Sequence, residues 1–158
     1  MADRVRWIWI PRWNLPAGQR DRQEVLPFPA CNLVVEPDGI ALYGPTTSIS
    51  YRELEGRGWA VGALLRPAGA GALCSPSLIR NSHRPLEDSD LKVAVASAMA
   101  DTNTTTGGQR AASALAAWVA QHTGPPQAMA LAANRMEDVV TSDRSILRVD
   151  QLARRLDL

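Results

Sequence analysis

Short apolar runs in the first half of the chain are typical of β-strands rather than helices. The run VRWIWI is rich in β-branched and aromatic residues and ends at Pro11. In a strand, Val5, Trp7 and Trp9 lie on one face and the two isoleucines lie on the other. Both faces therefore need cover, as they would in a closed or two-layered sheet.

Further runs follow at short intervals, each closed by proline or glycine. The sequence PDG at residues 37–39 is a strong turn signal, and the apolar run after it predicts a hairpin. The segment GRG at residues 56–58 is a second turn, and Pro67 ends the run that follows. Several short strands separated by regular turns predict a small barrel or sandwich. The predicted strands after the first are residues 24–28, 31–36, 40–43, 48–54 and 59–65.

The second half of the chain has the apolar spacing of helices. Residues 66–90, rich in proline, glycine and serine, form a transition. Ser89 or Asp90 is a candidate N-cap for a helix that ends near Ala100. Residues 101–108 are polar and predict a loop. Three more helices are predicted, at residues 109–122, 127–141 and 149–158, with GPP as a firm stop after the first. Apolar side chains recur at Ala112, Leu115, Ala116 and Val119 in the first of these, and at Leu131, Met136, Val139 and Val140 in the second.

The last ten residues carry an amphipathic stripe. Val149, Leu152, Ala153 and Leu156 follow the i, i+3, i+4, i+7 spacing of one helix face. A small residue such as Ala153 suits the first helix of a helix-turn-helix, where the second helix crosses closely. Leu158 would then begin the turn toward a recognition helix. An ordinary C-terminal helix has the same spacing, so these residues alone leave both interpretations open.

Three stretches of the strand region resemble the N-terminal part of AraC/XylS-type transcription regulators. They are the opening tryptophan-rich strand, EVLPFPACNLV at residues 24–34, and YGP at residues 43–45 followed by GWAVGALLRPAG at residues 58–69. The tail from Asp143 resembles the lead-in to the first helix-turn-helix of that family. Phe28 departs from the resemblance, because many relatives have a polar residue or histidine there.

The resemblance implies an α+β fold, with a cupin-like antiparallel β-roll or barrel followed by three to four α-helices. We expect the roll at residues 1–85, a helical dimerisation or linker region at residues 86–142, and the start of a helix-turn-helix at residues 143–158. The resemblance also implies that the natural chain continues into a domain that reads the DNA major groove. A small-molecule effector on the roll would bias DNA binding if it bound two conformations unequally.

Composition and charge are typical of a globular cytoplasmic protein that does not itself bind DNA. Hydrophobic residues make up 46% of the 158 residues, charged residues make up 21%, and the net charge is +1. A nucleic-acid binder usually has a stronger basic bias. No run approaches the roughly 20 apolar residues that cross a membrane, and the start lacks the pattern of a signal peptide. Cys31 and Cys74 are interpreted as reduced thiols.

Catalytic chemistry has little support in the sequence. A cupin-like metal site needs several converging ligands, and the two histidines, His83 and His122, lie outside the predicted strands. No nucleophile elbow or phosphate-binding loop is present. Glu53 and Glu55 could share a strand face but are more typical of a solvated edge. We therefore expect no catalytic residue, no metal and no cofactor.

Aromatic side chains of the predicted roll are the candidates for effector binding. Ligand pockets are mostly apolar with a few placed polar groups. Arg66, at the end of a strand, is the candidate polar anchor, and Arg52 is the alternative. The rings could equally fill a small core. The candidate lining residues are Trp9, Trp13, Tyr51 and Trp59.

The helix at residues 109–122 is the candidate for homodimer formation. Trp118 lies off its apolar stripe, and exposed tryptophan is enriched at interfaces. The candidate contact residues are Leu115, Trp118 and Val119. Packing of this helix against the roll of the same chain is the alternative.

Two other functional classes stay open for the whole chain. One is a free-standing cupin-like metal-dependent enzyme, which stoichiometric bound metal would reveal. The other is a non-catalytic interaction or dimerisation module, whose packed roll would bind no effector. The first hypothesis remains an effector-sensing and dimerisation domain whose DNA contacts are made by a further C-terminal domain.

Overall fold

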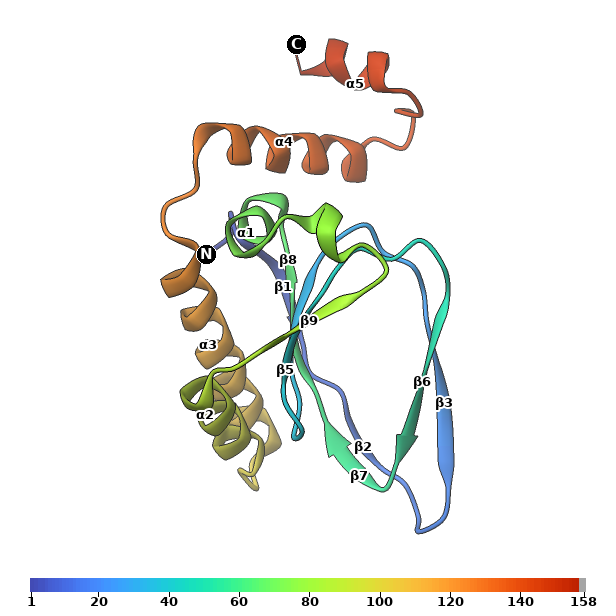
Figure 1. The fold of residues 1–158 in the computed structure, drawn as a ribbon, viewed down its shortest axis with the longest axis vertical. Coiled ribbons are helices and arrows are strands. Elements are labelled where there is room, and N and C mark those ends of the chain that lie inside the picture. Colours follow the sequence, from blue (N-terminus) through green and yellow to red (C-terminus); the bar gives the residue numbers. More distant parts are fainter. Residues whose placement is uncertain (157–158) are drawn as a thin grey trace.

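Five antiparallel strands form the central sheet of the computed structural model, which describes residues 1–156 (Figure 1). Two ribbons of two strands each form separate sheets. In spatial order, the central sheet contains β1 (Val5–Trp9), β8 (Val61–Leu65), β4 (Asn32–Val35), β5 (Ile40–Tyr43) and β9 (His83–Leu86). The ribbons pair β2 (Arg12–Asn14) with β7 (Arg57–Trp59), and β3 (Arg20–Val25) with β6 (Ser50–Glu55).

Helices follow the sheets along the chain, which confirms the predicted α+β class. The three sheets stay separate, and no closed barrel forms within residues 1–156. None of the described helices combines the length and apolar character needed to span a membrane. The helices are α1 (Pro67–Leu73), a short 3-10 helix (Pro76–Ile79), α2 (Ser89–Met99), α3 (Thr104–Thr123), α4 (Ala128–Ser142) and α5 (Val149–Arg155).

A bulge in β1 corrects the predicted assignment of its faces. The register shifts between Val5, which pairs with Leu65, and Trp7, which pairs with Leu64. The extra residue reverses the alternation of side chains at that point. As a result Val5 joins Ile8 in the core, whereas Trp7 is 47% exposed. The prediction that Val5 shares a face with the two tryptophans of β1 is therefore wrong.

The predicted hairpin at the PDG turn is confirmed. β4 and β5 pair antiparallel, with Val35 opposite Ile40. The turn closes where the backbone N–H of Glu36 donates to the carbonyl of Gly39 at 2.9 Å. The strand predicted at residues 59–65 is instead divided between β7 and β8 at Ala60, whose N–H donates to the carbonyl of Pro11 at 3.2 Å.

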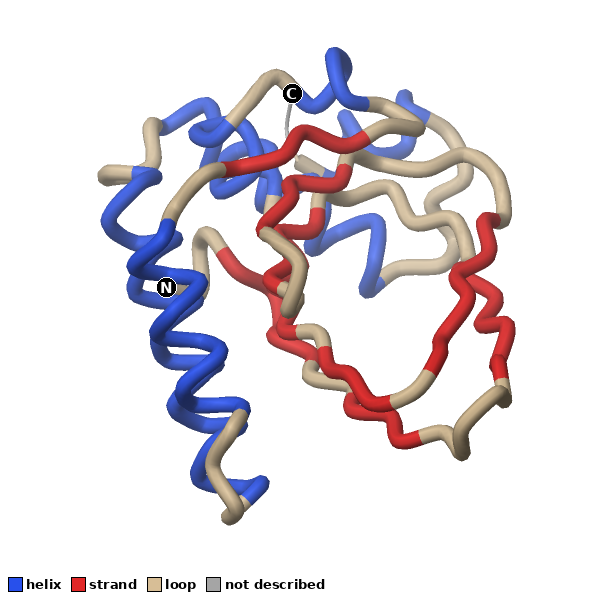
Figure 2. The backbone as a smooth tube through the Cα atoms, turned by 60° about the horizontal axis from the view of Figure 1, so that its bottom comes forward, coloured by secondary structure: helices blue, strands red, loops and turns tan. Residues whose placement is uncertain are grey.

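The core lies between one face of the central sheet and the helices α1, α2 and α3 (Figures 1 and 2). Each fully buried leucine or valine in it contributes about 1.5–3 kcal/mol relative to an exposed position. The strands supply Leu33, Val35, Leu42, Val61 and Leu65, and the helices supply Val95, Leu115 and Val119.

The start of α2 and the segment before it differ from the prediction. The N-cap of α2 is Asp88, whose carboxylate accepts a hydrogen bond from Leu91 N at 2.8 Å. The transition segment is also more ordered than its composition indicates, because it contains α1 and β9. β9 completes the central sheet by pairing with β5.

The polar segment predicted as a loop forms the first turn of α3. Asn103 caps this helix, and its side chain accepts from Thr106 N at 3.1 Å. Gly107 is buried where α3 meets α2, and a Cβ there would lie 2.4 Å from the carbonyl oxygen of Ala98. The close crossing needs a glycine, so packing outweighs the low helix propensity of this segment.

Polar contacts hold α4 on the rest of the fold. The one residue of this helix that is buried is Asn134, at 3% exposure, and not a member of the predicted apolar stripe. Its side chain accepts from Ala68 N at 3.0 Å and donates to the carbonyl of Asp3 at 2.7 Å. Val140, assigned to the stripe from the sequence, is 47% exposed.

The predicted last helix begins at Val149, as α5, and lies beside α4 (Figure 1). The side chain of Gln151 accepts hydrogen bonds from Leu147 N at 2.8 Å and Arg148 N at 3.0 Å, which satisfies two N–H groups at its start. The turn predicted at Leu158 lies outside the described residues.

Candidate functional site

A pocket of about 830 Å³ lies where the β2–β7 ribbon meets α2 and the start of α3. One wall comes from the strands and the other from the helices, so the pocket joins two parts of the chain. Its lining residues are Arg12, Trp13, Asn14, Pro37, Arg57, Gly58, Trp59, Ala96, Met99, Ala100 and Thr104.

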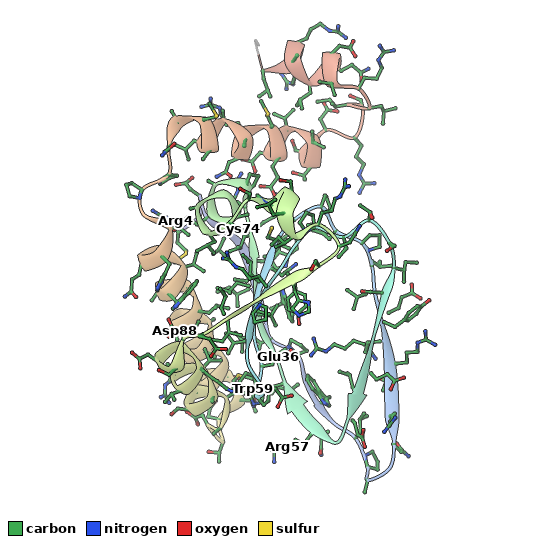
Figure 3. The ribbon with its side chains drawn as sticks, viewed as in Figure 1. Arg4, Glu36, Arg57, Trp59, Cys74 and Asp88 are labelled. Atoms are coloured by element: carbon green, nitrogen blue, oxygen red, sulfur yellow. The ribbon has the colours of Figure 1, made fainter. Side chains whose placement is uncertain are left out.

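Two tryptophans supply the aromatic part of the lining. The ring of Trp13 lies against Gly58, where a Cβ would approach it to 2.2 Å, and its Nε1 donates to the carbonyl of Glu55 at 3.3 Å. Trp59 is partly buried against the hydrophobic core. Figure 3 shows Trp59 on the side of the ribbon that faces the helices, with Arg57 further along the same strand. The absence of a side chain at Gly58 is what lets the Trp13 ring take its position.

Arg12 ties the ribbon to α2. Its guanidinium donates to the carbonyl of Met99 at 2.8 Å and to the Met99 sulfur at 3.4 Å. Met99 is the last residue of α2. A cation at this end of a helix interacts favourably with the helix dipole and with a carbonyl that has no partner in the helix. Arg12 therefore has a structural role in positioning the two walls of the pocket.

Arg57 is the second cation in the lining, and its side chain is exposed. It forms no side-chain hydrogen bond or ion pair with the part of the chain that the structure describes. It lies directly opposite Asn14 in the ribbon, with both side chains on the face that also carries Arg12 and Trp59. The lining holds two arginines and no carboxylate, so the pocket is positively charged.

The predicted ligand residues fall in different places. Trp13 and Trp59 line the pocket, whereas Trp9 lies over Gly62 and donates through Nε1 to Asn32 Oδ1 at 3.1 Å. Tyr51 is 54% exposed on β6 and stacks with the guanidinium of Arg22, 3.9 Å from its ring centroid.

The two candidate anchors are both engaged by carboxylates. Arg66 Nε lies 3.0 Å from Glu137 Oε2, and its terminal nitrogens reach Asp138 and the carbonyl of Asn134. Arg52 pairs with Glu36 and so connects the β3–β6 ribbon to the central sheet. Neither arginine lines the pocket.

The predicted dimer residues belong to the inner face of α3. Leu115 and Val119 are fully buried in the core of the same chain. Trp118 is partly buried, and its Nε1 donates to Asp88 Oδ2 at 2.6 Å. Its ring stacks on His122, with 3.9 Å between the centroids. The structure therefore has this face of α3 packed against its own chain.

The predicted helix-turn-helix residues lie on α5 and at its C-cap, and none of them is buried. Val149 is 83% exposed, and the other three members of the stripe are partly buried. These are Leu152, Ala153 and Leu156.

Sequence reasoning identified Trp13 and Trp59 and missed the other lining residues of the pocket, among them Arg12, Asn14, Arg57 and Met99. Arg12 and Arg57 lie next to the tryptophans along the chain, in the short sequences RW and RGW. That proximity is a signal, because alternation in a strand places Arg57 and Trp59 on the same face. Nothing in the local sequence indicates Met99, which reaches the pocket only through the packing of α2.

No group of three or more histidine, cysteine, aspartate or glutamate side chains that could hold a metal ion occurs among the described residues. His83 stacks on Tyr43, with 5.2 Å between the ring centroids. Cys31 and Cys74 are free thiols. The pocket itself is lined by no histidine, cysteine or carboxylate side chain.

One protein family matches the chain: its description is a domain of unknown function (DUF6597), and it matches residues 1–83. The match includes both strands of the β2–β7 ribbon and ends before α2. Neither the curated proteins nor the solved structures contain a match to this chain.

Proposed function

This chain belongs to the DUF6597 family, and we propose, from the resemblance of its sequence to AraC/XylS-type regulators, that it is the effector-sensing and dimerisation domain of an AraC-type transcription regulator. The proposal is supported by one observation above all, the pocket between the β2–β7 ribbon and the helices. A ligand there contacts both walls at once. It can therefore change how the strands and helices pack, which a ligand buried within one sheet would not do.

The helices offer a continuous path from this pocket toward the end of the chain. Met99 and Ala100 lie at the end of α2, and Thr104 begins α3. α3 leads directly into α4, and α4 packs beside α5. In the proposed regulator, α5 is the first helix of a DNA-binding domain, and the protein acts in the cytoplasm. In this proposal the DNA contacts are made by the part of that domain that follows α5.

The proposed effector pocket can be tested by blocking it. Ala100→Trp places a large side chain at an exposed position of the lining, where it fills space without disturbing the core. Ala117→Trp, on an exposed part of α3 outside the pocket, is the matched control. A small-molecule library is screened against each variant by thermal unfolding. A ligand at a hundred times its Kd adds about 2.7 kcal/mol to stability.

We expect ligands that stabilise the unmodified chain and the Ala117→Trp variant but not the Ala100→Trp variant. A library in which no compound stabilises the chain, or in which every hit survives the Ala100→Trp change, contradicts the proposed pocket. A gel-shift assay adds a separate check, because we expect the chain alone to bind no operator specifically. Metal analysis of the purified protein tests the enzyme hypothesis, since stoichiometric metal would favour a metal-dependent cupin-like enzyme.

The outer face of α2 and α3 is the proposed dimer surface. A groove of about 540 Å³ runs between these helices, lined mainly by small side chains. Val93, at its edge, is 67% exposed. The proposed contact thus uses the flank of α3 opposite to Leu115 and Val119. The proposed contact rests on this groove and on the exposed side chain of Val93 beside it.

A charge placed in this groove tests the dimer. Val93→Glu should give a monomer by sedimentation velocity while leaving the helical circular dichroism unchanged. Val140→Glu, at an exposed valine of α4, is the control and should leave the association state unchanged. If the unmodified chain sediments as a monomer at every concentration, the dimerisation part of the proposal is wrong.

A further inference from the structure

Cations without matching anions set the chemistry of the pocket. Arg12 and Arg57 both line it, and no aspartate or glutamate does. Arg12 is engaged by the end of α2, whereas Arg57 is exposed and forms no ion pair with the described residues. Positive charge in a recess attracts anions and raises their local concentration. The ligand chemistry of the pocket is therefore governed by one available guanidinium.

Strand geometry places a second donor beside that guanidinium. Asn14 and Arg57 are cross-strand partners in the β2–β7 ribbon. Such partners have Cβ atoms roughly 5 Å apart. An arginine fork binds a carboxylate through two parallel hydrogen bonds, and an asparagine amide can donate a third. Both groups share the face that carries Trp59, so one ligand can reach all three side chains.

The aromatic ring of Trp59 lies one two-residue strand repeat from Arg57. Trp59 is two residues beyond Arg57 on the same face, which corresponds to a separation of roughly 7 Å. A flat apolar body attached to a carboxylate by a short spacer can lie against Trp59 while its anionic end reaches Arg57. A bare inorganic anion would use only one of these features, and a neutral ring would use only the other.

We infer that the pocket binds a small aromatic carboxylate, with Arg57 and Asn14 holding the carboxylate and Trp59 packing against the ring. This inference rests on the proposed function, since it names the class of effector for the same pocket. Arg57 is the specificity-determining residue. Arg12 acts as a positioning residue that keeps α2 against the ribbon.

Two probes of nearly the same shape separate the contribution of the carboxylate charge to binding from that of the ring. 1-Naphthylacetate carries the ring, the spacer and the carboxylate, and 1-naphthylacetamide has nearly the same shape without the charge. Binding of each is measured by isothermal titration calorimetry on the whole chain. We expect the acid to bind with a Kd below about 1 mM and the amide to bind roughly 10-fold to 100-fold more weakly, because it forms no charge-assisted hydrogen bond.

Variants of two arginines test whether Arg57 is the residue that binds the carboxylate of the probe. Arg57→Gln removes the charge but keeps a shorter, polar side chain. It should weaken binding of the acid roughly 10-fold to 100-fold while leaving binding of the amide unchanged. Arg135→Gln removes an exposed arginine of α4 outside the pocket and should change neither Kd. Circular dichroism confirms that both variants are folded.

The outcomes distinguish this inference from the proposed function beneath it. Equal binding of acid and amide, or acid binding that survives Arg57→Gln, overturns the aromatic carboxylate assignment. If neutral library compounds bind and Ala100→Trp abolishes their binding, the proposed effector pocket stands and only the ligand class is wrong. If neither the acid nor any library compound binds, both are wrong.

Discussion

The Nε atom of Arg66 lies 3.0 Å from Oε2 of Glu137, and this ion pair joins the end of β8 to α4. A second arginine, Arg6 of β1, contacts the other oxygen of the same carboxylate at 3.2 Å. Asn134, one turn earlier on α4, is hydrogen-bonded to backbone groups of both Ala68 and Asp3. α4 is thus attached to the sheet region by directional polar contacts, which break over short displacements.

Removing the shared carboxylate should loosen α4. Glu137→Gln eliminates both of these ion pairs and leaves the two largely buried guanidinium groups with only the more exposed carboxylate of Asp138. We expect a loss of about 1–3 kcal/mol in the free energy of unfolding, because partly buried charges lose their partner. Amide hydrogen exchange of α4 should rise more than that of the central sheet.

The control for this change is an exposed ion pair. Arg154→Gln breaks the contact with Asp150, in which the two side chains are 70% and 49% exposed. Such pairs contribute less than about 0.5 kcal/mol, so stability should barely change. A Glu137→Gln variant as stable as Arg154→Gln, with unchanged exchange in α4, would refute the polar attachment.

Neighbouring glycines of α3 should respond in opposite ways to alanine. At Gly107 the added Cβ meets the Ala98 carbonyl oxygen at 2.4 Å, which is backbone and cannot yield without moving α2. We expect Gly107→Ala to cost about 1–3 kcal/mol through this overpacking. At Gly108 the nearest atom is Ile10 Cδ1 at 3.7 Å, so Gly108→Ala should be neutral or stabilising by up to about 1 kcal/mol.

Urea unfolding of the two glycine variants measures this difference. The same residue change at adjacent helical positions holds composition and helix propensity constant, so only the crossing of α2 and α3 distinguishes them. Equal stability of the two variants would mean that the helices do not cross at Gly107.

Asp88 joins the start of α2 to α3, because it caps Leu91 N and accepts from Trp118 Nε1 at 2.6 Å. The hydrogen bond from Leu91 N, followed by that from Trp118, lowers the pKa of this carboxyl below its usual 3.8. Asp88→Ala should cost about 1–2 kcal/mol at neutral pH. Asp88→Asn keeps an acceptor for the cap and should recover most of that loss.

The sign of the pH dependence follows from the lowered pKa of Asp88. The unfolded state binds the proton first as pH falls, so the carboxylate stabilises the fold above its ordinary pKa and loses that effect below it. Urea unfolding from neutral to acid pH should therefore show the advantage of the unmodified chain over Asp88→Asn shrinking below about pH 4. A constant difference over that range would contradict the ionised cap.

The thiol of Cys31 should make stability fall at alkaline pH. Burial, with a smaller contribution from neighbouring Cys74, raises the pKa of Cys31 from 9.0 to about 11. Above the lower value the unfolded chain releases the proton while the folded chain retains it, so the unfolded state gains stability. This effect amounts to about 1 kcal/mol by about pH 10.

Comparison with Cys31→Ala isolates the effect of this thiol, because the unmodified chain and the variant share all other groups that titrate at alkaline pH. The stability advantage of the unmodified chain over the variant, measured by urea unfolding, should shrink between about pH 8 and about pH 10. At the lower pH, iodoacetamide should alkylate Cys31 more slowly in the folded chain than in urea, because the reactive species is the thiolate. A pH-independent difference, together with rapid alkylation of the folded chain, would refute the raised pKa.

Local sequence determined most of the secondary structure of this protein. The alternating run before Pro11 forms β1, the PDG turn forms the β4–β5 hairpin, and α3 ends at the predicted GPP stop. Each of these depends on properties carried by adjacent residues, namely backbone dihedral preference and the repeat of apolar side chains. The aromatic lining at Trp13 and Trp59 could be predicted in part for the same reason.

Tertiary structure alone decided which face of its strand or helix a side chain lies on and which residues it contacts. The β1 bulge reversed the face of Val5, Gly107 became helical to admit α2, and the predicted anchor Arg66 was engaged by α4. The pocket formed because Arg12 reaches Met99, which is 87 residues away along the chain. A guanidinium bonds whichever acceptor packing brings within about 3 Å, and no local pattern encodes which acceptor that is.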